Sequence, residues 1–274
     1  MDHKTAILID GNFFLHRAKL IWGNKSPEGL ASLLMKYCYA HMKDSGNREL
    51  YRIYYYDCPP ASIDTENPIS GEMSYSSNSP SSNWRRRFYH ALARKRKVAL
   101  RMGVLDTSNP TWMLSGYKLE SLIRGEMTVD QLHPEDLHLQ IRQKGVDLYL
   151  GMDMASLAYK GLVDQIVLLA GDSDFVPAAI LVRTEGIDLV LDPMWLPVGN
   201  KLLEHVDGLR SMVWRYPDGT FDTRIGYRPT YAERREMYQS SQRENREDNG
   251  LNHDEDEDYA AYSDDDYDTD SSLD

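Results

Sequence analysis

Two continuous apolar runs mark the interior of this protein. They occupy residues 5–9 and 166–170, and runs of this length are typical of strands buried on both faces of a parallel sheet. Weaker patterns predict further strands over residues 49–56, 98–105, 137–142 and 187–191, and helices over residues 26–43, 147–159 and 175–183. Because strands alternate with helices, the sequence predicts an α/β fold with a mostly parallel central sheet.

Other stretches lack this pattern. Residues 59–83 are rich in proline and serine and are predicted to be a flexible insertion, and residues 110–136 are expected to be irregular with one short helix or strand. The apolar pattern fades after about Pro217, which predicts a linker or weak helix over residues 216–242. We therefore predict one folded domain over residues 1–215.

The net charge of −12 is concentrated at the C-terminus. Residues 243–274, the acidic tail, hold 14 acidic and 2 basic residues, whereas the preceding residues hold 29 of each. The tail has too few large apolar residues to form a core, so it is predicted to be disordered. It could compete with RNA for a basic groove of the body, or it could only aid solubility or bind a protein partner.

Compartment and membrane association can also be judged from composition. No apolar run approaches the roughly 18 residues of a membrane span. The two cysteines, Cys38 and Cys58, form no disulfide framework or zinc spacing, so a reducing cytoplasmic location is expected.

Acidic residues follow both apolar runs. Asp10 follows the first run, and Asp172 and Asp174 follow the second within Gly-Asp-Ser-Asp. Asp147 lies at the start of a predicted helix. The carboxyl ends of parallel strands lie on one side of a sheet, where these acids can converge. Carboxylates held close together repel unless a cation lies between them, and hard oxygen ligands suit Mg²⁺ or Mn²⁺. The alternative is that Asp172 and Asp174 only cap the following helix.

Three motifs carry a family resemblance. They are Ile-Leu-Ile-Asp-Gly-Asn at residues 7–12, Lys-Gly-Val-Asp at residues 144–147 and Ala-Gly-Asp-Ser-Asp-Phe-Val-Pro at residues 170–177. In this order they resemble the NYN domain family of the PIN-like nuclease superfamily, over roughly residues 5–215. The resemblance implies a three-layer PIN-like (Rossmann-like) fold and metal-dependent hydrolysis of RNA phosphodiester bonds by an endoribonuclease.

The resemblance also implies roles for individual residues. The residues that match the metal-binding acids are Asp10, Asp147, Asp172 and Asp174, with Mg²⁺ or Mn²⁺ as the cofactor. Asn12 matches the polar residue beside the first acid and joins them as a catalytic residue. Asp153 matches another recurrent position. It lies about 240° around the helix from Asp147, so we expect it to support the site rather than to bind the metal.

One position of the PIN-like pattern has no clear counterpart. Many PIN-like enzymes carry an extra glutamate on an early helix, and Glu28 and Asp57 are the candidates for it here.

A basic run suggests an RNA-binding surface. Arg85, Arg86 and Arg87 stand between Trp84 and the pair Phe88-Tyr89, and such residues can bind phosphates and stack on bases. The alternative is an ordinary helix with solvated arginines and buried aromatic rings. Two further nucleic-acid-binding candidates come from the motifs: Lys144 and Ser173.

Two other functions are compatible with parts of this pattern. A haloacid-dehalogenase-type phosphatase also uses a strand-end aspartate, but it needs a second aspartate where this chain has Asn12. A catalytically weak or inactive RNA-binding or scaffold protein could retain the PIN-like fold. The partners expected from the nuclease hypothesis are single-stranded or structured RNA and, in addition, a second copy of the chain.

Overall fold

The computed structural model describes residues 3–44, 48–61, 63–75, 79–235 and 237 of the 274-residue chain. The acidic tail therefore lies outside the described residues. The strands are β1 (Lys4–Asp10), β2 (Glu49–Asp57), β3 (Asp64–Glu66), β4 (Met73–Tyr75), β5 (Val98–Met102), β6 (Val104–Leu114), β7 (Leu137–Lys144), β8 (Gln165–Leu169), β9 (Asp188–Asp192) and β10 (Gly208–Leu209). The α-helices are α1 (Gly11–Trp22), α2 (Pro27–Asp44), α3 (Pro80–Ala93), α4 (Gly116–Ile123), α5 (Val146–Tyr159), α6 (Val176–Thr184) and α7 (Asn200–Leu203). Short 3₁₀ turns are η2 (Val129–Gln131), η3 (Pro134–Asp136) and η4 (Ser173–Phe175).

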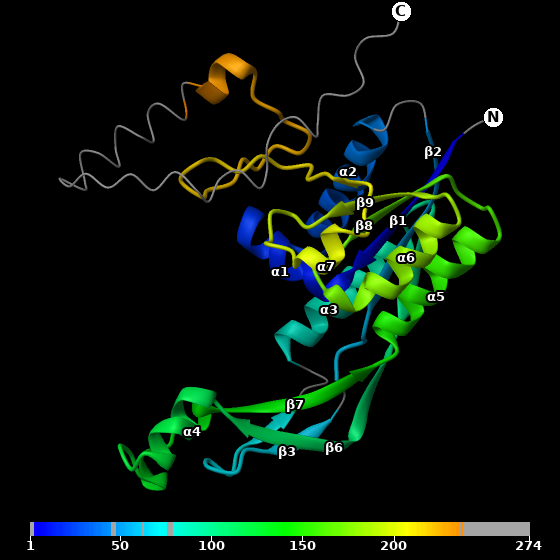
Figure 1. Ribbon diagram of the computed structural model, residues 1–274. Helices are drawn as coiled ribbons and strands as arrows, with labels where there is room; N and C mark the ends of the chain where they lie inside the picture. Colours follow the sequence, from blue (N-terminus) through cyan, green and yellow to red (C-terminus); the bar gives the residue numbers. More distant parts are fainter. Residues whose placement is uncertain (1–2, 45–47, 62, 76–78, 236, 238–274) are drawn as a thin grey trace, which may run out of the picture.

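A six-stranded sheet forms the centre of the molecule. Its strand order is β10-β9-β8-β1-β2-β5, and all its neighbouring strands pair in parallel. Helices α1, α2 and α3 cover one face, and α5, α6 and α7 cover the other (Figure 1). This arrangement confirms the predicted α/β fold with a mostly parallel sheet.

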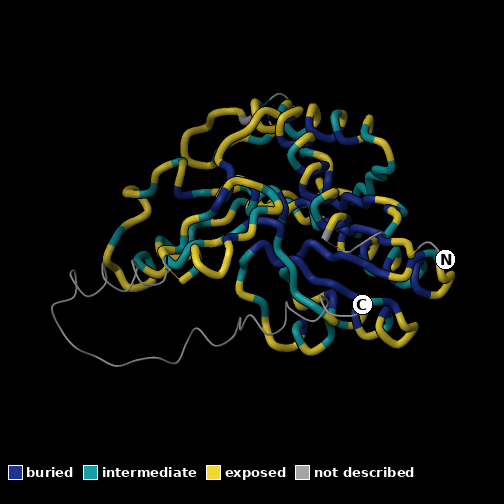
Figure 2. Tube along the Cα trace, turned by 90° about the horizontal axis from the view of Figure 1, so that it is seen from above, coloured by how far each residue is buried: buried dark blue, intermediate teal, exposed yellow. Residues whose placement is uncertain are grey.

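The two apolar runs form the two central strands of this sheet. Along β1, Ile7 and Ile9 pack into the core under α1 and α2, whereas Ala6 and Leu8 pack into the core under α5 and α6. All four side chains are fully buried. A strand covered by helices on both faces needs apolar residues at every position, which explains the continuous run. Figure 2 shows that the buried residues, in dark blue, lie mainly in the interior of the described chain.

Helix α1 begins directly after β1. The sequence pattern did not predict this helix. The Asp10 carboxylate accepts a hydrogen bond from the Phe13 N–H at 3.1 Å and caps the helix. Gly11 is required at this turn, because a Cβ atom there would lie 2.6 Å from the carbonyl oxygen of Tyr56. The chain thus turns sharply enough to keep Asp10 at the edge of the sheet.

Residues 104–144 form an arm that extends from the sheet (Figure 1). Strands β6 and β7 pair antiparallel, and the chain between them forms α4, η2 and η3. The strand predicted over residues 98–105 is therefore two strands, divided at Gly103. A Cβ atom at Gly103 would lie 2.7 Å from the Val146 side chain and 2.8 Å from the Lys144 carbonyl oxygen, so only glycine fits between the crossing chains.

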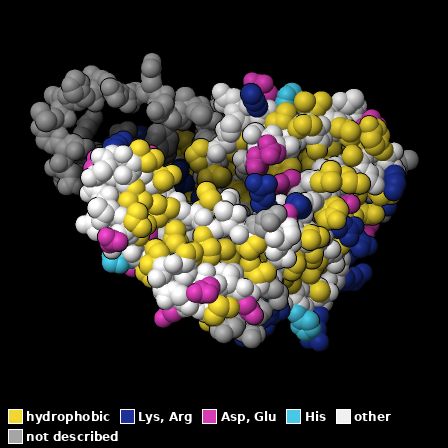
Figure 3. Space-filling view, turned by 90° about the horizontal axis from the view of Figure 1, so that it is seen from below, with side chains coloured by type: hydrophobic (Ala, Val, Ile, Leu, Met, Phe, Trp, Pro, Cys, Tyr) yellow, Lys and Arg dark blue, Asp and Glu magenta, His cyan; other side chains and the backbone are white. Residues whose placement is uncertain are grey.

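The arm has little hydrophobic core. None of the apolar side chains that the structure describes in it is buried, and Figure 3, which views the molecule from the side of the arm, shows many hydrophobic side chains on the surface. Its most exposed apolar residues are Val104, Met113, Tyr117, Leu119, Ile123 and Val129. A two-stranded ribbon of this kind is only marginally stable by itself.

The arm is therefore expected to open far more often than the central sheet. Its backbone amides should exchange with deuterium at least about a hundredfold faster than those of β1 and β8, because local opening free energy falls with the number of buried apolar contacts. Hydrogen exchange measured by mass spectrometry over peptides from both regions tests this. Equal protection of β6 and β8 would contradict it and would show that the arm is covered in solution.

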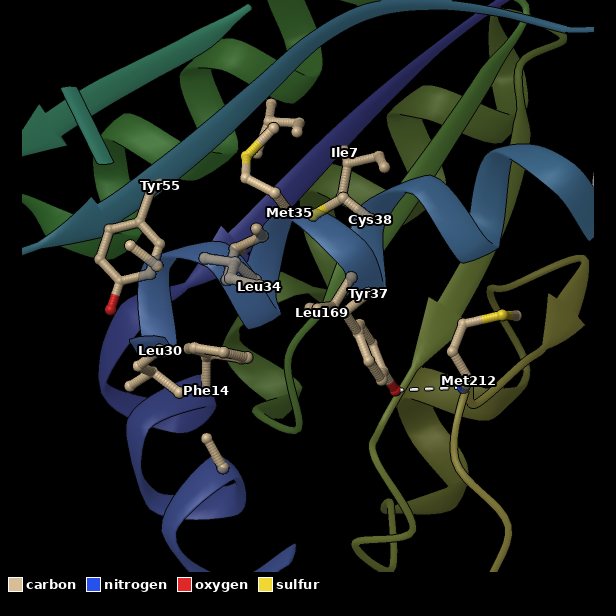
Figure 4. Close-up of a cluster of buried hydrophobic side chains, with 14 of the residues drawn as sticks. Ile7, Phe14, Leu30, Leu34, Met35, Tyr37, Cys38, Tyr55, Leu169 and Met212 are labelled. Carbon is tan, nitrogen blue, oxygen red and sulfur yellow. Dashed lines mark hydrogen bonds between the residues drawn. The ribbon is translucent and has the colours of Figure 1, made fainter. Parts of the chain in front are cut away.

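The segment after β10 packs against α1 and α2. The Tyr37 hydroxyl oxygen accepts a hydrogen bond from the Met212 N–H at 3.1 Å (Figure 4). The Trp22 ring N–H donates to the Thr223 carbonyl oxygen at 3.1 Å, and Phe221 and Ile225 pack against the same core. Part of the predicted linker over residues 216–242 thus contributes to the fold.

Within the described chain, no helix combines the length and apolar character needed to cross a membrane.

Candidate active site

Four acidic residues from three distant segments lie at the carboxyl edge of the sheet. Asp10 ends β1, and Asp172 and Asp174 follow β8, whose Leu169 lies beside Ile9 in the register. Asp147 is in the first turn of α5, which packs on the same half of the sheet. We call Asp10, Asp147, Asp172 and Asp174 the edge acids. The topology thus brings the predicted acids to one edge, as the parallel arrangement requires.

Asp10 is the most buried of the edge acids. Burial and, to a smaller extent, the negative charges of Asp147 and Asp57 raise the pKa of its carboxyl group to about 6, against the lowering effect of the Phe13 N–H. Asp10 therefore occupies a position where negative charge is unfavourable unless a cation is close. A carboxylate in such a position is suited to binding a metal cation.

The other three edge acids face solvent. Burial raises the pKa of the Asp147 carboxyl group, and the charges of Asp172 and Asp174 raise it further. The Asp172 Oδ1 atom accepts a hydrogen bond from the Asp174 N–H at 3.0 Å. Asp172 therefore does cap the turn η4, as the capping alternative predicts, and this bond also fixes the orientation of its carboxylate.

Among the described residues, the edge acids lack the cationic partner that the nearby acids Asp57 and Asp153 have. Within the described residues, no lysine, arginine or histidine forms an ion pair with them, whereas Asp153 pairs with Arg101 at 2.9 Å and Asp57 with Arg85 at 3.5 Å. In the same part of the chain, no three acidic, histidine or cysteine side chains are close enough together to hold a metal ion as they stand. The edge acids thus influence each other electrostatically without forming a closed ligand set.

Asp153 faces away from this group. Its Oδ2 atom accepts hydrogen bonds from the Tyr56 hydroxyl and from the Arg101 Nε–H, both at 2.9 Å. A carboxylate held in this way is already neutralised and oriented. Asp153 therefore links α5 to β2 and β5, in agreement with the helical geometry that separates it from Asp147.

Asp57 is a buried acid beside the site whose role sequence reasoning did not resolve. It ends β2, the strand next to β1, and its side chain is fully buried. Its carboxylate accepts hydrogen bonds from the Cys58 N–H at 2.8 Å and the Tyr89 hydroxyl at 2.9 Å, and it pairs with Arg85. Burial raises its pKa despite these partners. The position of Asp57 at a strand end was the only sign of its role in the sequence. Its partners Arg85 and Tyr89 lie on α3, far away in the sequence, and could not be predicted.

The basic run on α3 divides into residues with different surroundings. Arg85 pairs with buried Asp57, Arg86 donates to the Asn83 side chain at 2.7 Å, and Arg87 pairs with Glu28 at 3.0 Å. Arg86 and Arg87 are exposed. Glu28 is thus bound on the outer surface by Arg87 and is not one of the edge acids.

The aromatic residues of this run are largely part of the core. Phe88 is fully buried and Tyr89 is 8% exposed, so neither ring can stack on a base as the RNA-binding hypothesis required. Trp84 is half-buried and stacks on Phe88 with ring centres 5.3 Å apart. Only the arginines and the outer face of Trp84 are available to a ligand.

The remaining candidates lie near the edge acids in the sequence. Asn12 and Ser173 are exposed, each beside an edge acid. Lys144 is also exposed, and its ammonium group pairs with Asp106 at 2.6 Å across the base of the arm. Lys144 therefore closes the ribbon where it leaves the sheet, directly before Asp147.

The parallel sheet between helical layers, with acids at the carboxyl edge of its central strands, agrees with the fold that the resemblance to PIN-like nucleases implies. The family model of the NYN domain matches residues 63–194. This domain family belongs to the PIN-like superfamily, and its members are generally nucleases that act on RNA. The matched region contains Asp147, Asp172 and Asp174, whereas Asp10 precedes it.

Comparisons with individual proteins add little. No curated protein matches the chain. Among solved structures, the chain is similar to a noncanonic maltogenic α-amylase, AmyB, from Thermotoga neapolitana, with 8% sequence identity and a TM-score of 0.19. The similarity covers 75% of this chain and 48% of the amylase chain, and it carries no argument about fold or function.

Proposed function

We propose that this protein is a metal-dependent endoribonuclease whose edge acids bind Mg²⁺ or Mn²⁺. One observation carries the proposal: three distant segments bring four carboxylates to one edge of the sheet, where neighbouring acids raise the pKa of Asp10 and of Asp147, and none of the four has a cationic partner among the described residues. By contrast, Asp57, Asp106 and Asp153 are each paired with arginine or lysine. A divalent cation would supply the missing positive charge.

The donor set fits such a cation in kind. Carboxylate oxygens are hard ligands suited to Mg²⁺ and Mn²⁺. Burial and the neighbouring acids make the negative charge of Asp10 unfavourable, and its pKa of about 6 records that cost. A bound divalent ion would lower the pKa of a coordinated water and neutralise charge on the phosphate.

The protein's own residues would hold and orient this site. The Phe13 N–H fixes the Asp10 carboxylate, and the Asp174 N–H fixes that of Asp172. Asn12 is exposed one residue beyond Gly11, where its amide can donate to a phosphate oxygen. The N-terminus of α5 favours negative charge at Asp147 and on a phosphate beside it.

The test is cleavage of labelled RNA with Mg²⁺ or Mn²⁺, with and without EDTA. We expect cleavage with either metal and none after chelation. Full activity in EDTA would contradict the proposal. RNA binding without cleavage in the presence of either metal would instead identify a scaffold protein that retains the fold.

Arg86 and Arg87 are the arginines best placed to bind the RNA backbone. Replacing both by alanine should weaken RNA binding and reduce the slope of log affinity against log salt by about 0.7 for each phosphate that the protein no longer binds. Fluorescence anisotropy with a labelled single-stranded RNA measures this. Arg124→Ala is the matched control, because Arg124 is also exposed and also paired, with Glu120 on the arm. An unchanged slope would show that the run is a solvated helix face.

A further inference from the structure

A groove with a volume of about 950 Å³ lies between α2 and the segment 211–228. One face of α2 forms its floor, with Lys36, Tyr39 and Lys43 spaced at helical intervals. Met212 and Ile225 contribute apolar surface from the opposite wall. The groove is therefore an amphipathic channel with two lysines on the α2 side and Arg228 on the opposite wall.

The wall of this groove is held in place by hydrogen bonds. The Gly226 N–H donates to the Met212 carbonyl oxygen at 2.7 Å, and the Met212 N–H donates to the buried Tyr37 hydroxyl. Gly226 also crosses α2 closely, because a Cβ atom on it would lie 3.8 Å from the Ala40 Cβ. The groove is thus part of the packed fold.

Among the described residues, the two lysines of the groove have no carboxylate partner. Lys36 and Lys43 are exposed, and within the described part of the chain neither forms an ion pair. In contrast, Lys97, Lys118 and Lys144 each pair with an acid. Lys36 and Lys43 are two helical turns apart, which separates them by about 10.5 Å along α2. An anionic ligand with charges at this spacing would complement them.

We propose that the groove binds the acidic tail of this same chain, through residues 254–267. These residues read Asp-Glu-Asp-Glu-Asp-Tyr-Ala-Ala-Tyr-Ser-Asp-Asp-Asp-Tyr. In a polyproline II segment, which has three residues per turn and a rise of about 3.1 Å per residue, acids three residues apart lie on one side and are separated by about 9 Å, close to the spacing of the two lysines. The three tyrosines supply rings that fit against Tyr39, which is 45% exposed, and the apolar wall.

The length of the chain permits this contact. The last described residue is Met237, and the 17 residues from there to Asp254 can span up to about 55 Å. Arg228 lines the groove, and Met237 is nine residues further on and therefore at most about 32 Å from it, so the segment can reach the groove. Tethering raises the local concentration of the segment to about 1 mM, and a dissociation constant as weak as about 0.1 mM would keep it bound most of the time.

Binding in the groove would not cover the edge acids, because none of them lines it. The inference therefore does not depend on the proposed nuclease activity. Its consequence is that the tail excludes other polyanions, RNA among them, from the α2 surface.

The experiment is cross-linking of the full chain with a water-soluble carbodiimide, which joins lysine amines to carboxylates in contact. Peptide mapping by mass spectrometry should find products that link Lys36 or Lys43 to residues 254–258 or 264–266. These products should exceed those at the exposed control lysines Lys160 and Lys201 by about tenfold. Raising the salt from about 0.1 M to about 1 M shortens the screening length from about 10 Å to about 3 Å and should remove them.

One double variant and one mixing experiment complete the test. Lys36→Gln with Lys43→Gln removes both charges and should leave the tail without a preferred site, so products at other lysines should not rise to the level seen in the groove. An equal mixture of ¹⁴N- and ¹⁵N-labelled chains should give products within one chain only. Three results would each overturn the proposal. The first is cross-linked products between chains, and the second is an even spread of products over all lysines. The third is protection of Lys36 and Lys43 by RNA without any product that links them to the tail.

Discussion

Asp10→Asn and Asp172→Asn are each expected to reduce RNA cleavage about a thousandfold. A divalent ion held by carboxylates stabilises the transition state by several kcal/mol, and each 1.36 kcal/mol corresponds to about a factor of ten in rate. Both carboxylates are at the edge of the sheet, and an amide in place of either one would weaken the metal site. The variants should remain folded, because removing a negative charge relieves repulsion among the edge acids.

The measurement is single-turnover cleavage of an end-labelled RNA at saturating Mn²⁺. Asp164→Asn is the matched control, since Asp164 comes directly before β8 and Asp172 lies beyond its other end. It should cleave at the wild-type rate. Wild-type rates in both Asp10→Asn and Asp172→Asn would show that the site has been assigned to the wrong residues.

Asp192→Ala is expected to cause the largest loss of stability, about 4 kcal/mol. Asp192 ends β9 and is fully buried. Its carboxylate accepts hydrogen bonds from the Tyr37 hydroxyl at 2.6 Å, the Ser211 hydroxyl at 2.8 Å and the Met194 N–H at 2.7 Å, and it lies 2.8 Å from the His41 Nε2 atom. Removing it leaves several buried polar groups without their acceptor, and removing one partner from such a network typically costs about 3–5 kcal/mol.

Urea unfolding monitored by circular dichroism measures this change in stability. Asp218→Ala serves as the control, because Asp218 is on the surface and accepts hydrogen bonds only from its neighbour Thr220. It should change stability by less than about 1 kcal/mol. A loss of stability smaller than about 1 kcal/mol in Asp192→Ala would contradict the role given to the buried network, which connects α2 and residues 211–212 to the sheet.

The sequence predicted the centre of the fold because that region obeys local rules. The strands β1 and β8 are buried on both faces, so their apolar runs are continuous. The acids that follow them are placed by the chain direction alone, since parallel strands end at the same edge. Helix α5 also has a clear start at Gly145, which adopts a left-handed conformation with a φ of 87°.

Other features depend on contacts between distant segments. Asp57 forms an ion pair with Arg85 and accepts a hydrogen bond from the Tyr89 hydroxyl. Both partners lie on α3, and the residues next to Asp57 in the sequence give no sign of these contacts. The arm could not be read from periodicity, because its ribbon has no buried face and its register shifts between Asp106 and Thr111. The segment 211–228 packs through single residues on irregular chain, which leaves no repeating pattern.

Binding of Mn²⁺ to the protein without RNA tests the central proposal most directly. Titration calorimetry should show binding to the wild-type chain and to Asp164→Asn, and the affinity should fall at least about tenfold in Asp10→Asn and in Asp147→Asn. The acidic tail could also bind cations weakly, but it is the same in all four proteins, so the difference reports on the edge acids. Equal Mn²⁺ affinity for all four proteins would contradict the assignment of the metal site to the carboxyl edge of the sheet.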